Sequence, residues 1–234
     1  ENVLKSYGVS VITGAGLKEI KEGTAVYTKN GEEDTLDGDA ILLATGRGPN
    51  TEGLHAERAG VELTKRGAVV TDKHLRTTAE NIWAAGDVCG NLQFTYISLD
   101  DSRIILSDMQ GDGSRTTENR GAFAYSVFME PSFSRAGLSE KEAADKGLNY
   151  RVVRMNTDMI PKAKVLRKTT GMLKAVIDKD SGKIFGAALF CPESYEIINM
   201  VKLAMDHDLD YTVLRDFIYT HPTMSEGLND LFAL

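Results

Sequence analysis

A chain of 234 residues is long for one domain and short for three complete ones, because domains usually run to about 100 to 200 residues. Apolar residues make up 42% and charged residues 26% of the chain, which is typical of a folded protein and excludes disorder as the overall state. The longest apolar run lies near Ala40–Ala44, far short of the roughly 18 residues that a membrane span needs. We therefore expect no membrane partner.

The net charge and the two cysteines exclude further classes of partner and site. The net charge is −7 and no basic stripe interrupts the mixture, so a nucleic-acid partner is not expected. Cys89 and Cys191 are too far apart in sequence to form a paired metal or redox motif, which favours a cytoplasmic location and predicts no metal site. The chain begins at Glu1 without a signal-peptide pattern or an initiator Met, so we expect a piece of a longer protein.

The first part of the chain predicts short strands at residues 9–12, 25–28 and 40–44. The Asn30-Gly31 pair is a strong hairpin signal because both residues tolerate positive φ. Further strands are predicted at 68–71 and 82–85, and the second of these has the apolar character of a strand buried on both faces.

A helix is predicted next, with Ile97, Ile104, Ile105 and Met109 on one side. The polar, glycine-rich stretch 111–121 that follows is the expected boundary between two parts of the chain.

Beyond this boundary the pattern is α+β. Ser139 and Glu142 have the spacing of a capping box, which predicts that a short helix begins at Ser139, and Gly147 is typical of a residue that ends a helix. Strands are predicted at 173–178 and 184–190. A helix carrying Ile197, Ile198, Val201 and Met205 should follow, and a last helix should begin near Thr223.

Two apparent ligand motifs are better explained as turns. Gly14-Ala15-Gly16 lacks the third glycine of a dinucleotide fingerprint, since Glu19 stands there and Gly23 interrupts the helix that the fingerprint needs. Residues 178–182 resemble the start of a calcium loop, but the position of the bidentate Glu is Leu189.

Two other motifs are more specific. Residues 44–51, Ala-Thr-Gly-Arg-Gly-Pro-Asn-Thr, take an apolar strand into a glycine turn where the backbone could approach a ligand. Residues 82–88 end a second apolar strand at Gly86-Asp87, where a carboxylate can accept hydrogen bonds from sugar-like hydroxyls. On the residues alone, the first motif could be a plain strand exit, and Asp87 could merely cap a turn.

Together these motifs resemble the second half of the pyridine nucleotide-disulfide oxidoreductases. In that family the Ala-Thr-Gly-Arg strand, which includes Gly46, leaves the NAD(P) domain, and a Thr…Gly-Asp motif like Thr77…Gly86-Asp87 binds FAD. The resemblance places Thr95 and Tyr96 at a helix N-terminus against the flavin, where free N–H groups and the helix dipole stabilise negative charge.

The resemblance continues to the end of the chain, through residues 127–131 and 137–140 and on to His221-Pro222-Thr223, with Glu226 after it. It implies that His221 moves a proton and that Glu226 orients its ring, which suits an imidazole with an ordinary pKa of about 6.5. Thr223 and Glu226 could instead form only a capping box for the last helix.

The expected architecture is α/β plus α+β: the tail of an NAD(P) domain at 1–46, the second portion of an FAD-binding domain at 47–118, and an α+β dimerisation domain at 119–234. The full-length enzyme would use FAD and NAD(P), and this chain alone is expected to be inactive and to retain neither cofactor. The homodimer expected from the resemblance would use apolar helix positions such as Ile198, Val201 and Met205.

The substrate implied by the resemblance is a disulfide, a metal ion or a quinone. Mercuric reductases carry a terminal cysteine pair, whereas this chain ends Leu-Phe-Ala-Leu, which argues against mercury. Residues 93–101 look most similar to the reactive-chlorine-resistance branch, which is associated with copper(II) reduction. The competing interpretation is a non-enzymatic dimerisation module without a cofactor.

Overall fold

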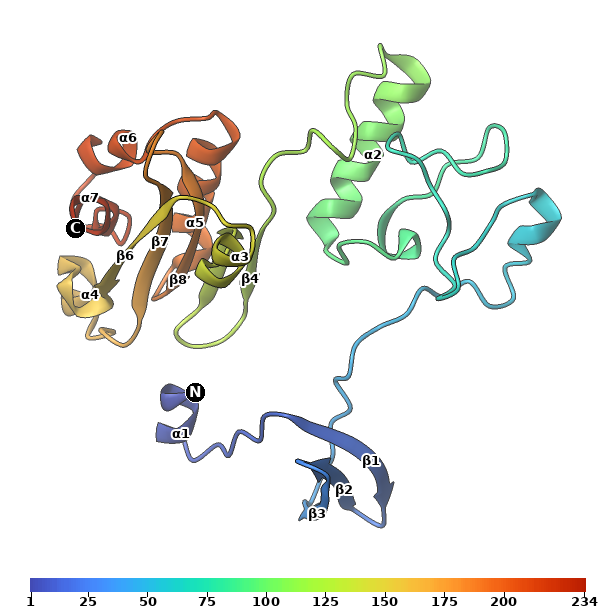
Figure 1. Ribbon diagram of the computed structural model, residues 1–234, viewed down its shortest axis with the longest axis horizontal. Coiled ribbons are helices and arrows are strands. Elements are labelled where there is room, and N and C mark those ends of the chain that lie inside the picture. The colour runs from blue at the N-terminus through green and yellow to red at the C-terminus, as the bar shows by residue number, and fades with distance from the viewer.

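The computed structural model describes residues 1–234 and contains two antiparallel sheets, with a helix-bearing segment between them in sequence (Figure 1). None of the helices combines the length and the apolar composition that a transmembrane span requires.

The first sheet follows a short helix, α1 (Asn2–Ser6), and has the order β1-β2-β3, with β1 at Ala15–Lys21, β2 at Thr24–Lys29 and β3 at Glu32–Asp37. Asn30 and Gly31 both have positive φ and join β2 to β3, which confirms the predicted hairpin turn. The strand predicted at 9–12 is wrong, because the chain extends without pairing there and β1 begins only after the turn at Gly14. Gly14-Ala15-Gly16 therefore leads into a strand and not into a nucleotide-binding helix.

Three further predicted strands, at 40–44, 68–71 and 82–85, are also absent. Isolated bridges near the second and third of them, Leu63 to Val69 and Arg76 to Trp83, are the only ladder contacts there. Their apolar composition suits central strands, but a central strand needs a hydrogen-bonded strand on each side, and none of these three segments belongs to a sheet. Leu42 is 88% exposed as a result.

The segment between the two sheets is held mainly by one long helix. It contains two 3₁₀ turns, η1 (Ala56–Ala59) and η2 (Gly86–Cys89), and then α2 (Thr95–Gln110). This helix confirms the prediction from apolar spacing, since Ile97 and Ile104 are buried, whereas Met109 is exposed.

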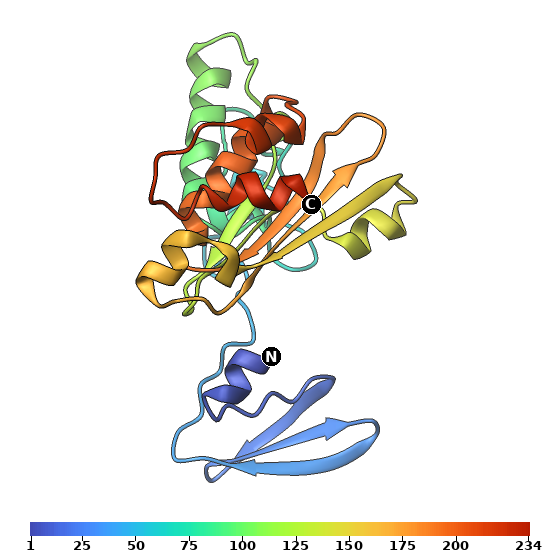
Figure 2. The same cartoon turned by 90° about the vertical axis from the view of Figure 1, so that its left-hand side faces the viewer.

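The second sheet has five strands in the order β4-β5-β8-β7-β6, and every neighbouring pair is antiparallel (Figure 2). Its strands are β4 (Ala124–Val127), β5 (Phe133–Gly137), β6 (Tyr150–Asn156), β7 (Met172–Asp178) and β8 (Ile184–Phe190). The last two confirm the predicted hairpin, and residues 178–182 form its turn. Gly186 allows β8 to pass close to the backbone of Leu138.

Helices surround this sheet. They are α3 (Glu140–Asp145), α4 (Pro161–Leu166), α5 (Ser194–Asp206), α6 (Tyr211–Asp216) and α7 (Gly227–Ala233), together with a 3₁₀ turn, η3 (Thr157–Met159). Ser139 and Glu142 form both bonds of the predicted capping box at α3. The last helix begins at Gly227 and not near Thr223.

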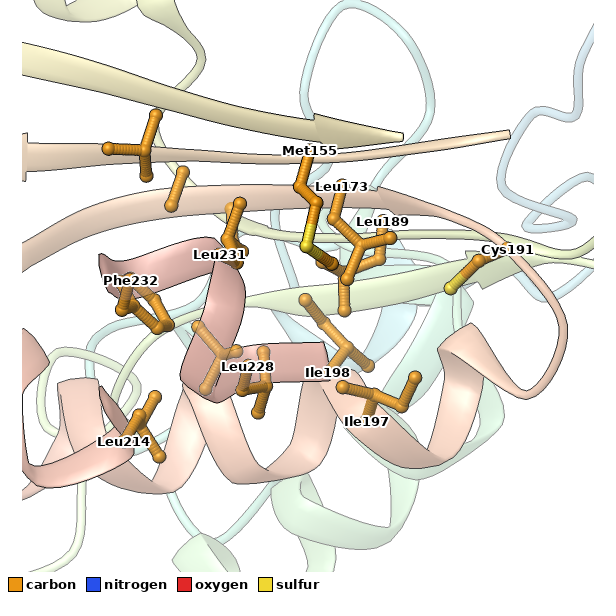
Figure 3. Packing of buried hydrophobic residues seen from close by; sticks show 14 of the residues in the cluster. Met155, Leu173, Leu189, Cys191, Ile197, Ile198, Leu214, Leu228, Leu231 and Phe232 are labelled. Carbon is orange, nitrogen blue, oxygen red and sulfur yellow. The ribbon is translucent and has the colours of Figure 1, made fainter. Parts of the chain in front are cut away.

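A single core of 21 buried residues joins the second sheet to α5, α6 and α7 (Figure 3). Leu173 and Leu189 of the sheet contribute to it, as do Ile197, Ile198 and Val201 of α5. Ile198 and Val201 are thus core residues, so their expected place on a dimer surface is wrong. The exposed large apolar side chains of the same helix are Tyr195, Met200 and Leu203.

Candidate functional site

The Gly86-Asp87 turn lies against the N-terminal half of α2. Gly86 has φ +75°, and a β-carbon there would stand 2.8 Å from the hydroxyl oxygen of Ser98. Both the backbone angle and the lack of space therefore require glycine. The amide of Gly86 donates to Oδ2 of Asp101 at 2.8 Å, which fixes the turn on the helix.

The two specific sequence motifs meet at this turn. Arg47 Nη1 lies 3.9 Å from Oδ2 of Asp87, and both side chains are well exposed to solvent. Gly46, next to Arg47, has φ +114° with open space around it, so its conformation rather than crowding favours glycine. A pair of this exposure contributes little stability, and the Asp87 carboxylate remains available to accept hydrogen bonds from a ligand.

Thr95 and Tyr96 are the first two residues of α2. The amides of Ile97 and Ser98 donate the first hydrogen bonds of the helix, both to the carbonyl of Phe94. The amides of Thr95 and Tyr96 precede these bonds and are not used by the helix. No side chain caps this end. Uncapped amides and the positive end of the helix dipole together suit an anionic or hydrogen-bond-accepting group.

The Tyr96 hydroxyl donates to the carbonyl of Ala124 and so links α2 to β4 of the second sheet. Burial raises the pKa of Tyr96, which keeps the hydroxyl protonated as a donor.

A hollow of about 700 Å³ opens at this junction. Its lining residues come from the 44–51 motif, the start of α2, β4 and α5, and they include Arg47, Thr95, Tyr96, Tyr125, Tyr195 and Lys202. Three aromatic rings pack beside it: Phe94 and Phe123 are tilted by 56° with centroids 5.3 Å apart, and Phe123 and Tyr125 are stacked with centroids 5.7 Å apart. Sequence reasoning missed Tyr125, Tyr195 and Lys202, because they belong to elements that only the fold brings beside α2.

These features fit one wall of a flavin site. A planar ring system suits an aromatic-sided hollow, free helix amides suit its electron-accepting edge, and a carboxylate at a glycine turn suits the hydroxyls of the ribityl chain. The predicted residues Gly86, Asp87, Thr95 and Tyr96 lie together around α2, and Gly46 lies next to Arg47, which reaches Asp87.

His221 and Glu226 form a second cluster that does not line this hollow. His221 Nδ1 lies 2.8 Å from Oε2 of Glu226; the imidazole is 71% exposed, whereas the carboxylate is only 14% exposed. The buried Oε1 of Glu226 has no hydrogen-bond partner. This geometry leaves Nε2 of the ring facing outward and holds the ring by its other nitrogen.

The same contact bears on the two interpretations of Glu226, as an orienting residue and as part of a capping box. Its amide donates to Oγ1 of Thr223 at 3.3 Å, which is half of a capping box. The reciprocal bond is absent because the Glu226 carboxylate is directed to His221. Thr223 therefore caps a turn, and α7 begins four residues later than the sequence predicts.

The two cysteines lie away from these clusters. Both are buried and free, and burial raises the pKa of Cys89 to about 11 and that of Cys191 to about 12. They are protonated at neutral pH and poorly nucleophilic. No group of three or more His, Cys, Asp or Glu residues gathers where it could hold a metal ion.

Comparison with known proteins identifies the family. Residues 1–102 match the profile of the pyridine nucleotide-disulphide oxidoreductases, and residues 123–232 match the dimerisation domain of the same family. The chain belongs to the pyridine nucleotide-disulphide oxidoreductase family. The recognition from sequence is thereby confirmed, and so is the fold class, with the end of the redox domain preceding the dimerisation domain.

Individual proteins of the same family are similar to this chain over nearly its whole length. A probable pyridine nucleotide-disulfide oxidoreductase of Escherichia coli, RclA, is 47% identical over 232 residues, which are 99% of this chain and 53% of that protein. A mercuric reductase of Staphylococcus aureus is 34% identical over 230 residues, covering 96% of this chain and 42% of that protein. This family member therefore spans about half the length of the curated relatives it matches.

Solved structures give the same result. The HOCl-induced flavoprotein disulfide reductase RclA from Escherichia coli superposes with a TM-score of 0.91 at 46% identity, covering 100% of this chain and 54% of that one. A copper(II) complex of the same protein superposes with a TM-score of 0.91 at 46% identity, covering 99% of this chain and 53% of that chain.

Proposed function

We propose that this chain is part of an FAD-dependent NAD(P)H oxidoreductase, to which it contributes one wall of the flavin site, a dimer surface and a proton relay. The observation that carries the proposal is the junction of the Gly86-Asp87 turn with the uncapped start of α2 beside an aromatic-sided hollow. The flavin, when bound, supplies the chemistry of accepting a hydride from NAD(P)H and passing on two electrons.

In this proposal the residues of the chain have separate tasks. Asp87 accepts hydrogen bonds from hydroxyls of the ribityl chain, and Thr95 and Tyr96 stabilise negative charge at the flavin ring with their amides. Gly46 and Gly86 let the backbone approach. His221, held by Glu226, exchanges a proton through its outward Nε2 with a thiol or substrate, since reduction of a disulfide by two electrons consumes two protons.

The substrate class is a disulfide, a metal ion or a quinone. The copper(II) complex of the similar Escherichia coli protein supports the metal-ion alternative, in which two copper(II) ions would each take one electron. The mercuric reductase at 34% identity supports a metal ion as well.

We propose the homodimer as the working form, supported by the dimerisation-domain match and by the exposed apolar side chains of α5 together with the fully exposed Phe128. The division at residues 46 and 118 remains part of the proposal, as does the cytoplasmic location, which the two free cysteines support. Light scattering of micromolar protein should give twice the monomer mass.

The test of the proposed function is spectroscopic. The full-length protein should be purified with a flavin absorbance spectrum that is bleached by NADH or NADPH without oxygen and restored by a disulfide, copper(II) or a quinone. The isolated 234-residue chain should hold little or no flavin, because it supplies only one wall. A full-length protein that is colourless and binds no added FAD, yet dimerises, would refute the proposal in favour of a non-enzymatic dimerisation module.

A further inference from the structure

Two buried carboxylates of α2 hold the segment that leads to the Gly86-Asp87 turn. Asp108 accepts hydrogen bonds from Nε1 of Trp83 at 2.9 Å and from Nε of Arg76 at 2.7 Å. Asp101, seven residues earlier and thus two turns away on the same face, accepts from the amide of Gly86. The segment 83–86 belongs to no sheet and has only an isolated bridge at Trp83, so these carboxylates are the side chains that bind it to the helix.

Asp101 has a second partner on its other oxygen. Nη2 of Arg120 donates to Oδ1 of Asp101 at 2.8 Å, and Nε of the same guanidinium lies 3.4 Å from Oδ2 of Asp100. Asp101 is only 3% exposed and both of its oxygens are bonded. A buried carboxylate with a guanidinium and an amide as donors has a fixed orientation, because losing either donor leaves charge without compensation.

Arg120 belongs to the connection between α2 and β4, and two residues later that connection is bonded to the second sheet's helix layer. The amide of Ala122 donates to Oδ1 of Asp206 in α5 at 2.6 Å. The Gly86 amide is therefore connected to α5 by hydrogen bonds through Asp101 to Arg120, by the backbone from Arg120 to Ala122, and by the hydrogen bond from Ala122 to Asp206. Helix α5 is the one with the exposed apolar side chains.

We propose that Asp101 is a positioning residue: it sets the Gly86-Asp87 turn against the start of α2 and couples that turn, through Arg120, to the dimerisation domain. The inference rests on the proposed function in that the turn is taken to hold FAD. Asp101 itself touches no ligand, and its effect on binding is exerted through the Gly86 backbone.

Asp100 provides a matched control. It is the adjacent residue, it is buried at 8% exposure, and it pairs with Arg120 and Arg115, but it makes no contact with Gly86. Asp100→Ala and Asp101→Ala therefore remove the same charge from the same ion cluster, and only the second releases the turn.

The experiment compares the two variants in the full-length protein with two readouts. Asp101→Ala should raise the FAD dissociation constant roughly tenfold or more relative to Asp100→Ala, as expected for loss of a buried hydrogen bond to a charged group. In the apoprotein, amide hydrogen exchange of the peptide that contains Gly86 should accelerate in Asp101→Ala but not in Asp100→Ala. Asp101→Asn, which keeps the shape and one acceptor, should lie between these variants and serves if the alanine variant does not fold.

Equal exchange at the Gly86 peptide in the Asp101 and Asp100 variants would overturn the inference, as would equal FAD affinity in a protein that binds FAD. The exchange measurement needs no cofactor. If the wild-type protein binds no FAD, the proposed function fails, while the positioning of the turn by Asp101 is still decided by exchange.

Discussion

Replacing His221 by alanine separates a chemical role from a structural one. The imidazole is 71% exposed, so its removal costs little packing, but it leaves the Glu226 carboxylate, which is only 14% exposed, without its partner, and the free energy of unfolding should fall by about 1 to 3 kcal/mol. A positioned acid or base contributes about 10²- to 10⁴-fold to a rate, which corresponds to about 2.7 to 5.5 kcal/mol in the barrier. The kinetic effect should therefore be measurable in a protein that is still folded, and unfolding in urea measures the stability effect separately.

The assay is stopped-flow absorbance of the full-length protein with the two half-reactions measured apart. Flavin reduction by NAD(P)H should be unchanged in His221→Ala, because hydride transfer needs no proton from this residue. Reoxidation by a disulfide should slow by about 10²- to 10⁴-fold, because a thiolate leaving group needs a proton. Glu226→Gln should give a milder form of the same defect, since it preserves the shape but weakens the hold on Nδ1.

Thr223→Ala is the matched control. It removes the hydroxyl that accepts from the Glu226 amide and should cost about 1 kcal/mol of stability while leaving both half-reactions unchanged. An intact reoxidation rate in His221→Ala would refute the thiol-linked relay, and a metal-ion or quinone reductase would then be the better account.

Three further predictions concern the structure itself. In Gly186→Ala the new methyl group would overlap the backbone of Leu138, so urea denaturation should show that the free energy of unfolding falls by at least about 1 to 3 kcal/mol. Gly48 has no atom within 4 Å of the added β-carbon, so Gly48→Ala should change the free energy of unfolding by less than about 0.5 kcal/mol. Equal losses in the two variants would contradict the close packing at Gly186. Cys89 and Cys191 should resist iodoacetamide at pH 8 in the folded protein and react fully in urea, as read by mass spectrometry, because burial raises the pKa of both thiols; rapid labelling of the folded protein would show that they are accessible. Hydrogen bonds from Ser139, with Arg135 nearby, lower the pKa of Glu142 from 4.5 to about 2. The stabilising effect of this carboxylate is therefore complete above pH 4.5 and is lost as the pH falls towards 2. Glu142→Gln should make the urea midpoint depend less on pH in this range, and an unchanged dependence would disprove the assignment.

The elements that the sequence predicted well are those with local determinants. The hairpin of β7 and β8 has two largely apolar runs on either side of a polar turn, and the Ser139 box needs only residues three apart. The strands predicted at 40–44 and 82–85 depend instead on partners that apolar composition cannot supply.

The candidate site was predictable to a similar extent. The contact of His221 with Glu226 spans five residues and could be anticipated, although α7 starts later because the carboxylate is used by the imidazole. The carboxylates Asp101 and Asp108 were missed, because a polar residue within a helix is usually solvated. The partners of Asp101, Gly86 and Arg120, lie 15 and 19 residues away, and those of Asp108, Trp83 and Arg76, lie 25 and 32 residues away, so only the fold reveals the bonds.

The uneven distribution of buried side chains has a consequence for biosynthesis. None of the first fifty residues is buried, whereas the 21-residue core lies entirely after residue 123. A ribosome releases the chain from its N-terminal end, at about 5 to 20 residues per second, so the apolar segment around Leu42 emerges well before the part of the chain that can collapse on itself. When this 234-residue chain is expressed by itself, its core is complete only at Phe232, about 190 residues and so roughly 10 to 40 seconds later at that rate. During that time the segment is exposed to chaperones that bind extended apolar chain, and the yield of folded protein should depend on their supply.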